Sequence, residues 1–301
     1  MKKNLFLLTV VTLCVMMMVS SVSIFAQEKK ITVGAKNYTE QYILGNIVSV
    51  LLEENGFKVS EKMGTGSAIT REGLVSGQTD LYPEYTGTAW LVYLGHEEEV
   101  ITVPEELYQK VKEEDLKKNN IVWLERSDVN NTYAIALTQE QAEEIGTTLS
   151  DLTEYVNEHH NLIWGICHEF AERADGLQGM AEHYGMEINE TNIRMMDPGL
   201  TYEPLAKGQT DITMVFSTDG KIKKYGLKVL EDDKNFFPVY NVCVTVRKDV
   251  LDQYPEIEKI VKPISELTNE AIQELNYQVD VTGLPERLVA KNYLAENGYL
   301  D

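Results

Sequence analysis

The stretch Leu74–Asp80, which reads LVSGQTD, recurs as Leu205–Asp211, which reads LAKGQTD. In both copies a helical pattern ends at the glycine, and a strand-like run begins after the aspartate. An aromatic ring stands five residues beyond each aspartate, Tyr85 in the first copy and Phe216 in the second. A unit of helix, GQTD, strand and aromatic ring that is used twice predicts two similar α/β lobes.

Strand and helix patterns alternate on the N-terminal side of the first copy. Residues 31–34 have the pattern of a short strand, residues 39–55 carry apolar side chains at helical spacing, and residues 57–59 begin another strand. We expect Ser67 to cap a helix that reaches Ser76. Alternation of this kind is typical of a mainly parallel sheet that is covered by helices.

A second pair of similar segments places the connections between the lobes. Tyr133 opens a run of small and branched apolar residues, and Tyr240 opens another. We interpret the two runs as crossings, so that lobe 1 comprises residues 27–132 and 241–301 and lobe 2 comprises residues 133–240. The predicted fold class is therefore α/β, with two lobes, two crossover strands and a ligand in the cleft between the lobes.

The first residues have the character of an export signal. Lys2 and Lys3 precede a mostly apolar run, and Ser23 and Ala26 supply small residues before a cleavage point after Ala26. The predicted signal peptide is residues 1–26. An uncleaved anchor helix is the alternative, because the apolar stretch approaches the ~20 residues that a membrane span needs. Either way we expect an exported protein, periplasmic or on the outer face of the cytoplasmic membrane.

The composition limits the classes of partner. The 301 residues include 27 Lys and Arg against 48 Asp and Glu, which gives a formal net charge of −21. A nucleic-acid-binding protein normally has a basic face, so no nucleic-acid partner is expected. We attribute the acidity mainly to solubility, although it would also favour a cationic ligand.

The cysteines that follow the signal peptide are Cys167 and Cys243, and both lie in apolar strand-like runs. This favours two buried thiols, although an exported protein can also form a disulfide. Their spacing matches no zinc pattern.

Known catalytic motifs do not occur in the sequence. His168–Glu172 begins like a zinc-protease helix, but Glu172 stands where the second histidine would be. The sequence has neither a G-x-S-x-G elbow nor a phosphate-binding loop. We therefore expect no enzyme activity, no cofactor and no metal. A nucleophile and base that come together only in space remain the alternative.

Four aromatic residues are expected at one cleft. Ligands of open α/β sheets bind beyond the carboxyl ends of strands, where Tyr85 and Phe216 stand, and Tyr133 and Tyr240 border the same space at the crossings. Any one of these rings could instead belong to a core. A quaternary ammonium has no N–H to donate, and each ring face attracts it by roughly 0.5–2 kcal/mol. The arrangement therefore predicts an aromatic cage for such a cation.

Several stretches resemble the ABC-transporter substrate-binding proteins for osmoprotectants such as glycine betaine, choline and carnitine. The similar stretches are GAKNYTEQYILG (34–45), YPEYTGT (82–88), EFAERADG (169–176), FSTDG (216–220) and DDKNFFPVY (232–240). They follow the order of the family over essentially the whole chain after the signal peptide. The resemblance implies a periplasmic-binding-protein fold of type II, with two crossover strands.

The resemblance also implies roles for individual residues. The aromatic cage would comprise Tyr85, Tyr133, Phe216 and Tyr240, and the contacts to a ligand carboxylate would come from Lys36, Thr88 and Arg173. The family usually has a tyrosine at the position of Phe216, so a ring face is kept here while a phenol is lost. Tyr202 is interpreted as a packing residue.

Cationic side chains suit the carboxylate of a betaine, because they form charge-assisted hydrogen bonds and arginine can do so with two N–H groups. The alternative for Lys36 and Arg173 is a solvated charge or an ion pair with Glu40, Glu169 or Asp175. The resemblance favours the ligand role for both cations.

We therefore expect a monomeric receptor that captures a quaternary-ammonium osmoprotectant and delivers it to an ABC permease in the membrane. The alternative is a protein of the same fold that binds an amino acid or another small cationic solute. An α-amino group prefers acidic and carbonyl acceptors to four rings, which favours the quaternary ammonium.

Overall fold

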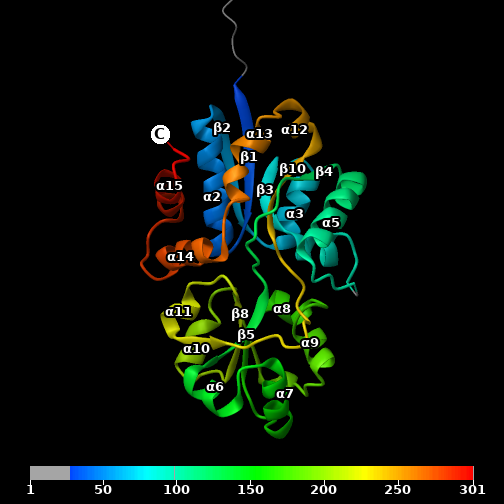
Figure 1. The fold of residues 1–301 in the computed structure, drawn as a ribbon, viewed down its shortest axis with the longest axis vertical. Helices are drawn as coiled ribbons and strands as arrows, with labels where there is room; N and C mark the ends of the chain where they lie inside the picture. Colours follow the sequence, from blue (N-terminus) through cyan, green and yellow to red (C-terminus); the bar gives the residue numbers. More distant parts are fainter. Residues whose placement is uncertain (1–27, 98, 301) are drawn as a thin grey trace, which may run out of the picture.

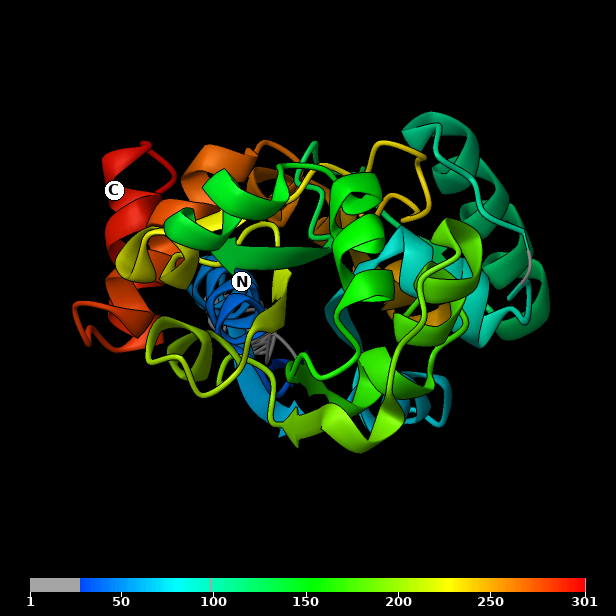
Figure 2. The ribbon, with the colours of Figure 1, turned by 90° about the horizontal axis from the view of Figure 1, so that it is seen from below.

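The computed structural model describes residues 28–97 and 99–300, and it shows two α/β lobes stacked along the long axis (Figure 1). The predicted signal peptide, residues 1–26, lies outside the described residues. Each lobe is built around one five-stranded sheet. Viewed from below in Figure 2, the green and yellow elements of the second lobe lie in front of those of the first, so the lobes meet end to end.

The sheet of lobe 1 has the strand order β2-β1-β3-β10-β4. Its strands are β1 (Lys29–Lys36), β2 (Phe57–Thr65), β3 (Leu81–Tyr85), β4 (Ile121–Trp123) and β10 (Val242–Arg247). β1 is parallel to β2 and β3, whereas β10 is antiparallel to β3 and β4. Lobe 1 is therefore completed by a strand from the C-terminal part of the chain.

The sheet of lobe 2 repeats this plan, with the order β7-β6-β8-β5-β9. Its strands are β5 (Tyr133–Thr138), β6 (Trp164–Cys167), β7 (Ile193–Met196), β8 (Ile212–Phe216) and β9 (Leu227–Val229). β6 is parallel to β7 and β8, and β5 is antiparallel to β8 and β9. Because β5 takes the place that β10 has in lobe 1, the sequence repeat corresponds to a repeated topology.

Helices surround both sheets (Figure 1). Those of lobe 1 are α2 (Thr39–Glu54), α3 (Ser67–Val75), α4 (Thr86–Thr88), η1 (Ala89–Tyr93), α5 (Pro104–Asn119), α12 (Lys248–Gln253), α13 (Ile257–Ile260), η3 (Lys262–Ile264), α14 (Asn269–Asp280) and α15 (Glu286–Glu296). Those of lobe 2 are α6 (Gln139–Ile145), α7 (Leu149–Glu158), α8 (His168–Glu172), α9 (Leu177–Tyr184), η2 (Glu190–Asn192), α10 (Tyr202–Ala206) and α11 (Lys221–Tyr225).

The two GQTD segments have the same local structure. Asp80 accepts a hydrogen bond from the backbone N–H of Thr32 at 2.7 Å, and Asp211 accepts one from the backbone N–H of Ile163 at 2.7 Å. The glycine of each copy has a positive φ, 78° in the first and 67° in the second, which ends the helix without strain. Each aspartate thus ties the start of its own strand, β3 or β8, to the backbone at the neighbouring strand, β1 or β6. Both β3 and β8 begin directly after the aspartate, as the sequence predicts.

The predicted cap of α3 is wrong by one residue. Ser67 is the first helical residue, and Gly66 occupies the cap position without a side-chain hydrogen bond. The carbonyl of Gly66 already accepts the backbone N–H of Thr70 at 3.0 Å, so the first helical turn closes on the glycine. The helix ends at Val75, close to the expected Ser76.

Helix α2 provides the largest helical contribution to the core of lobe 1. Its buried apolar side chains recur at helical spacing, as the sequence predicts: Ile43, Leu44, Ile47, Val48, Leu51 and Leu52. The helix lies between the sheet and the C-terminal helix α15 (Figure 1). Because β1 runs toward lobe 2, the first turn of α2 lies at the junction of the lobes.

The two segments that connect the lobes lie side by side. The backbone N–H of Asn131 donates to the carbonyl of Tyr240 at 3.1 Å, and that of Ser127 donates to the carbonyl of Val242 at 2.8 Å. Tyr133 is the first residue of β5, and Tyr240 stands two residues before β10. Both tyrosines therefore lie at crossings, as predicted.

Cys167 and Cys243 are free and buried, which confirms the prediction of two thiols. They lie in different lobes, on β6 and on β10. Burial raises the pKa of Cys167 to about 11, and it raises the pKa of Cys243 as well. Neither thiol is therefore activated as a nucleophile at neutral pH.

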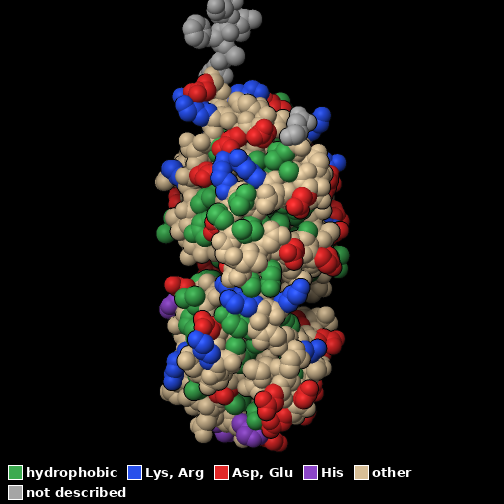
Figure 3. Space-filling model, turned by 90° about the vertical axis from the view of Figure 1, so that its left-hand side faces the viewer, with side chains coloured by type: hydrophobic (Ala, Val, Ile, Leu, Met, Phe, Trp, Pro, Cys, Tyr) green, Lys and Arg blue, Asp and Glu red, His purple; other side chains and the backbone are tan. Residues whose placement is uncertain are grey.

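The acidic surplus is not gathered in one place on the face that Figure 3 shows. Asp and Glu side chains are scattered there over both lobes among Lys and Arg side chains, and the molecule narrows between the lobes. This distribution agrees with a role of the charge in solubility.

Candidate functional site

A small cavity of about 30 Å³ lies between the lobes. Its walls comprise Lys36, Asn37, Tyr38, Ser67, Tyr85, Thr88, Asn131, Tyr133, Glu169, Arg173, Pro198, Phe216 and Tyr240. All seven residues that the sequence predicts for a binding site are among them. We call this space the cage cavity.

The predicted rings form a connected group. The ring centroids of Tyr133 and Phe216 are 5.4 Å apart, and those of Tyr133 and Tyr240 are 6.0 Å apart. Tyr85 and Phe216 are the last residues of β3 and β8, so each lobe supplies one ring from the end of a strand. Tyr133 and Tyr240 join them from the two crossings. Strand ends and crossings thus converge on one space.

A fifth ring, Tyr38, completes the group, although the sequence analysis did not single it out. It lies parallel to Phe216, with a centroid distance of 5.8 Å and an interplanar angle of 5°, and its ring is 6.5 Å from that of Tyr85. Tyr38 follows β1 and precedes α2, so it also stands beyond the carboxyl end of a strand. The rule that located Tyr85 and Phe216 would have located it.

Gly87 allows Tyr240 to approach lobe 1. A Cβ atom at this position would lie 2.6 Å from the ring of Tyr240 and 2.7 Å from the carbonyl oxygen of Val239. Gly87 follows Tyr85 by two residues, in the short helix α4. The absence of a side chain here therefore brings the second crossing against the end of β3.

Arg173 forms a bidentate ion pair with Asp175. Nε lies 2.7 Å from Oδ1 and Nη2 lies 2.5 Å from Oδ2. The guanidinium carbon stands 5.7 Å from the ring centroid of Tyr133 and 6.0 Å from that of Tyr240, and the hydroxyl of Tyr240 donates to Asp175. Burial acts to lower the pKa of Arg173, but Tyr133 and Asp175 outweigh it and the pKa is raised. The ion-pair alternative is thus present, and it fixes the guanidinium at the cavity wall.

Lys36 forms a buried ion pair with Glu84, a partner that the sequence analysis did not name. Nζ lies 2.5 Å from Oε1 of Glu84, and the two side chains are 2% and 0% exposed. Oε2 of Glu84 also accepts the hydroxyl of Tyr82 at 2.6 Å. The ammonium of Lys36 is 5.1 Å from the ring centroid of Tyr85. Its charge therefore lies beside the cage but is already compensated.

Thr88 and Tyr202 have different environments. Thr88 is buried in α4 and lines the cage cavity. Tyr202 is fully buried, and its hydroxyl accepts the backbone N–H of Phe216 at 3.1 Å. It is not among the residues that line the cage cavity, which agrees with its interpretation as a packing residue.

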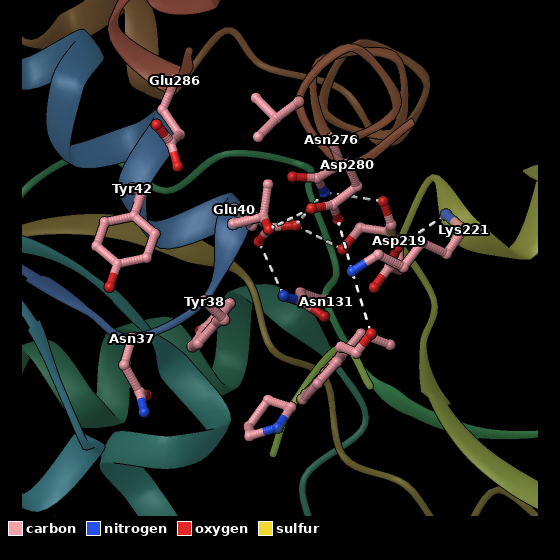
Figure 4. A pocket seen from close by; sticks show the side chains of 16 residues that line it. Asn37, Tyr38, Glu40, Tyr42, Asn131, Asp219, Lys221, Asn276, Asp280 and Glu286 are labelled. Carbon is pink, nitrogen blue, oxygen red and sulfur yellow. Dashed lines mark hydrogen bonds and ion pairs between the residues drawn. The ribbon is translucent and has the colours of Figure 1, made fainter. Parts of the chain in front are cut away.

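A second cavity of about 190 Å³ adjoins the first and shares Asn37, Tyr38, Asn131, Pro198 and Phe216 with it (Figure 4). Its remaining walls are mainly polar and include four acidic residues, Glu40, Asp219, Asp280 and Glu286, beside Lys221. Figure 4 shows Glu40 between Asn131 and Asn276. Tyr38 lines both cavities.

Neither a metal centre nor a membrane-spanning helix is found within residues 28–97 and 99–300. No group of three or more His, Cys, Asp or Glu side chains in this range is arranged to hold a metal ion. No helix within it has the length and apolar character that crossing a membrane would require.

Comparison with known proteins gives the family. Residues 29–296 match the model of the substrate-binding domain of ABC-type glycine betaine transport systems. The chain therefore belongs to this family, and it has the predicted periplasmic-binding-protein fold.

Individual relatives align with nearly the full length of this chain. A glycine-betaine-binding protein of Pseudomonas aeruginosa is 38% identical over 284 residues, which are 92% of this chain and 90% of that protein. An ergothioneine transport permease and binding protein of Helicobacter pylori is 36% identical over 90% of this chain and 48% of its own length. The crystal structure of a glycine betaine/carnitine/choline ABC transporter superposes with a TM-score of 0.75 at 28% identity, covering 90% of this chain and 100% of that one.

Proposed function

We propose that this protein captures a quaternary-ammonium osmoprotectant, such as glycine betaine, choline or carnitine, and delivers it to an ABC permease. The observation that carries the proposal is the convergence of five rings and one arginine on a single cavity between the lobes. The family provides the transport context, because its members are substrate-binding domains of glycine betaine transport systems.

The rings would receive the methylated ammonium group. Tyr85, Tyr133, Phe216 and Tyr240 present faces from both lobes and both crossings, and Tyr38 adds a fifth face. Each face contributes roughly 0.5–2 kcal/mol toward a desolvated cation. Several contacts together with burial of the methyl groups are enough for the ~8 kcal/mol of micromolar binding, after the cost of association.

Arg173 would receive the carboxylate of a betaine. Asp175 engages Nε and Nη2, and no partner of Nη1 is found among residues 28–97 and 99–300. A charge-assisted hydrogen bond from this nitrogen would add to the attraction of the full guanidinium charge. Lys36 and Thr88 line the same cavity and would assist, with Lys36 contributing less because Glu84 compensates it.

Capture would proceed by closure of the lobes. We place lobe 1 at residues 27–132 and 241–301 and lobe 2 at residues 133–240, with the paired crossings as the hinge. The walls of the cage cavity come from both lobes, and the rings of Tyr85, Tyr133 and Tyr240 are buried, so the lobes must part to admit a ligand. A ligand that contacts both lobes stabilises the closed form by its higher affinity for that form, and the permease would recognise the closed form.

The remaining properties follow from this role. An exported, monomeric receptor without enzyme activity or cofactor fits a family of transport components. The signal peptide, residues 1–26, would direct it to the periplasm or to the outer face of the cytoplasmic membrane. Binding of an ordinary amino acid is the alternative, and the cage disfavours it because five rings offer few acceptors for an α-amino group.

The test is a calorimetric titration of the protein without residues 1–26. Glycine betaine, choline and carnitine are titrated, with proline as the matched solute that has a secondary ammonium instead of a quaternary one. We expect dissociation constants near the micromolar range for at least one quaternary ammonium and no heat of binding for proline. Tighter binding of proline or another amino acid would overturn the proposal.

A further inference from the structure

Glu40 is a buried carboxylate that has no cationic partner in the described part of the chain. Its side chain belongs to the first turn of α2, at the junction of the lobes, and the residue is 3% exposed. No Lys, Arg or His nitrogen of the described chain lies within ion-pair distance of it. A buried charge without a counter-ion is costly, so it persists only where hydrogen bonds support it.

Four neutral donors supply that support, and they come from four parts of the chain. On Oε1, Glu40 accepts the hydroxyl of Tyr85 at 2.7 Å and the amide nitrogen of Asn131 at 2.9 Å. On Oε2, it accepts the hydroxyl of Thr218 at 2.5 Å and the amide nitrogen of Asn276 at 3.2 Å. Figure 4 shows the carboxylate between the amides of Asn131 and Asn276. Tyr85 connects the group directly to the cage.

Burial raises the pKa of the Glu40 carboxyl, whereas its four hydrogen-bond donors act to lower that pKa, and the orientation of the two amides favours the ionised form. Asn131 and Asn276 each direct the amide nitrogen, which can only donate, at one of the two carboxylate oxygens. Their own carbonyl oxygens are buried without a hydrogen-bond partner. Both amides thus leave an acceptor unsatisfied while they donate to Glu40, an arrangement that suits a carboxylate with two acceptor oxygens.

The other charges around the cage compensate one another. Lys36 is paired with Glu84, and Arg173 is paired with Asp175. Glu169 lines the cage cavity as well, but it is partly exposed, so solvent and salt screen it. Within residues 28–97 and 99–300, Glu40 is therefore a buried negative charge next to the cage that forms no ion pair with Lys, Arg or His.

We propose that Glu40 is the fixed counter-charge of the cage and makes the site favour ligands with a net positive charge over zwitterions. The inference rests on the proposed function. The hydrogen bond from Tyr85 to Glu40 places negative charge at the edge of a cage ring, which strengthens the attraction of that ring face for a cation. Glu40 is thus a specificity-determining residue that need not touch the ligand.

Choline and glycine betaine distinguish this role from a purely structural one. Both carry the same trimethylammonium group, which Glu40 attracts. Glycine betaine also carries a carboxylate, which Glu40 repels, so the net effect on the zwitterion is smaller. A structural defect of the cage would instead weaken both ligands by the same factor, because it would act on the group that they share.

The test is the variant Glu40→Gln, titrated calorimetrically with choline and glycine betaine at pH 7.5 and low salt. We expect the dissociation constant of choline to rise roughly tenfold more than that of glycine betaine, which corresponds to about 1.4 kcal/mol of selectivity. An equal change for both ligands, or no change, would overturn the inference while leaving the proposed function intact. Failure of the unmodified protein to bind either ligand would overturn both.

A second pair of variants separates the loss of the Glu40 charge from structural damage caused by the substitution. In Glu40→Gln the new amide faces the amide nitrogen of Asn276, which places two donors together. The double variant Glu40→Gln/Asn276→Leu removes this conflict, and circular dichroism checks that it is folded. It should show the same loss of choline selectivity, whereas Asn276→Leu alone keeps the charge and should keep the ratio of the two dissociation constants. A changed ratio in Asn276→Leu alone would contradict the inference.

Discussion

Tyr133 and Phe216 stand opposite each other across the antiparallel strands β5 and β8, with ring centroids 5.4 Å apart. β5 begins at Tyr133, directly after the first crossing, and β8 ends at Phe216. The pairing of these two residues in the sheet therefore positions two rings of the proposed cage. The pair is part of the sheet of lobe 2, so its geometry does not depend on a flexible loop.

Replacing Tyr133 should remove most of the affinity for every quaternary ammonium. Tyr133→Ala deletes one ring face and the packing that holds Phe216 and Tyr240, so we expect a loss of roughly 10- to 100-fold or more. Phe216→Tyr is the matched conservative variant, because it keeps the ring and adds only a hydroxyl, and its affinity should stay within about threefold. Isothermal titration calorimetry with choline measures both. Unchanged binding in Tyr133→Ala would refute the role of this ring.

Much of the fold could be predicted from local sequence patterns. The glycine and aspartate of each GQTD segment determine the end of a helix and the start of a strand, and these are short-range effects. The ends of β3 and β8 then followed from the pattern alone, and with them the positions of Tyr85 and Phe216. Tyr38 lies in the stretch 34–45, which serves in the sequence analysis only to establish the family resemblance. Its position beyond the end of β1 did not enter that analysis.

The charge partners could not be predicted, because they depend on which strands become neighbours. Lys36 and Glu84 are 48 residues apart and meet only because β1 and β3 lie side by side. The donors to Glu40 lie 45, 91, 178 and 236 residues away in the sequence. No sequence pattern predicts contacts between residues that are so far apart in the chain. The sequence analysis therefore names Glu40 only as an ion-pair partner for Lys36 or Arg173.

Replacing Arg173 should separate betaine from choline. Arg173→Ala removes the proposed donor to the ligand carboxylate, so the affinity for glycine betaine should fall at least roughly tenfold more than that for choline, which has no carboxylate. The shift in selectivity is opposite to that expected for Glu40→Gln. Competition titrations with both ligands measure it.

Arg173→Lys is the control for the charge of Arg173. It keeps the positive charge but not the planar fork that Asp175 holds, so it should recover only part of the affinity for glycine betaine. Equal losses for betaine and choline in Arg173→Ala would contradict the proposed contact and would point to the packing of Arg173 on Tyr133 and Tyr240 instead.

The pair of Lys36 and Glu84 should affect stability more than ligand choice. Lys36→Met leaves the carboxylate of Glu84 buried without its partner, and we expect a decrease of about 3–5 kcal/mol in the free energy of unfolding. The double variant Lys36→Met/Glu84→Gln removes both charges and should recover most of this loss. Urea denaturation followed by circular dichroism measures the three proteins. A single variant as stable as the unmodified protein would show that the pair contributes little.

Gly220 should control the closure of the lobes. It precedes α11 in lobe 2, and a Cβ atom there would lie 2.5 Å from the backbone nitrogen of Tyr277 in α14 of lobe 1. Because neither backbone can yield easily, Gly220→Ala should keep the lobes apart in the liganded state. We expect weaker binding of every ligand, by roughly tenfold or more, because part of the binding energy is then used against the contact.

Small-angle X-ray scattering with saturating choline measures this closure. The radius of gyration of the unmodified protein should decrease on binding, and that of Gly220→Ala should decrease less. Gly66→Ala is the matched control, since a Cβ at that position meets no atom within 4 Å and its φ is −63°. It should bind and close like the unmodified protein. Full closure and unchanged affinity in Gly220→Ala would mean that the junction of α11 and α14 does not limit the approach of the lobes, and closure would then have to be explained by the cage and the hinge alone.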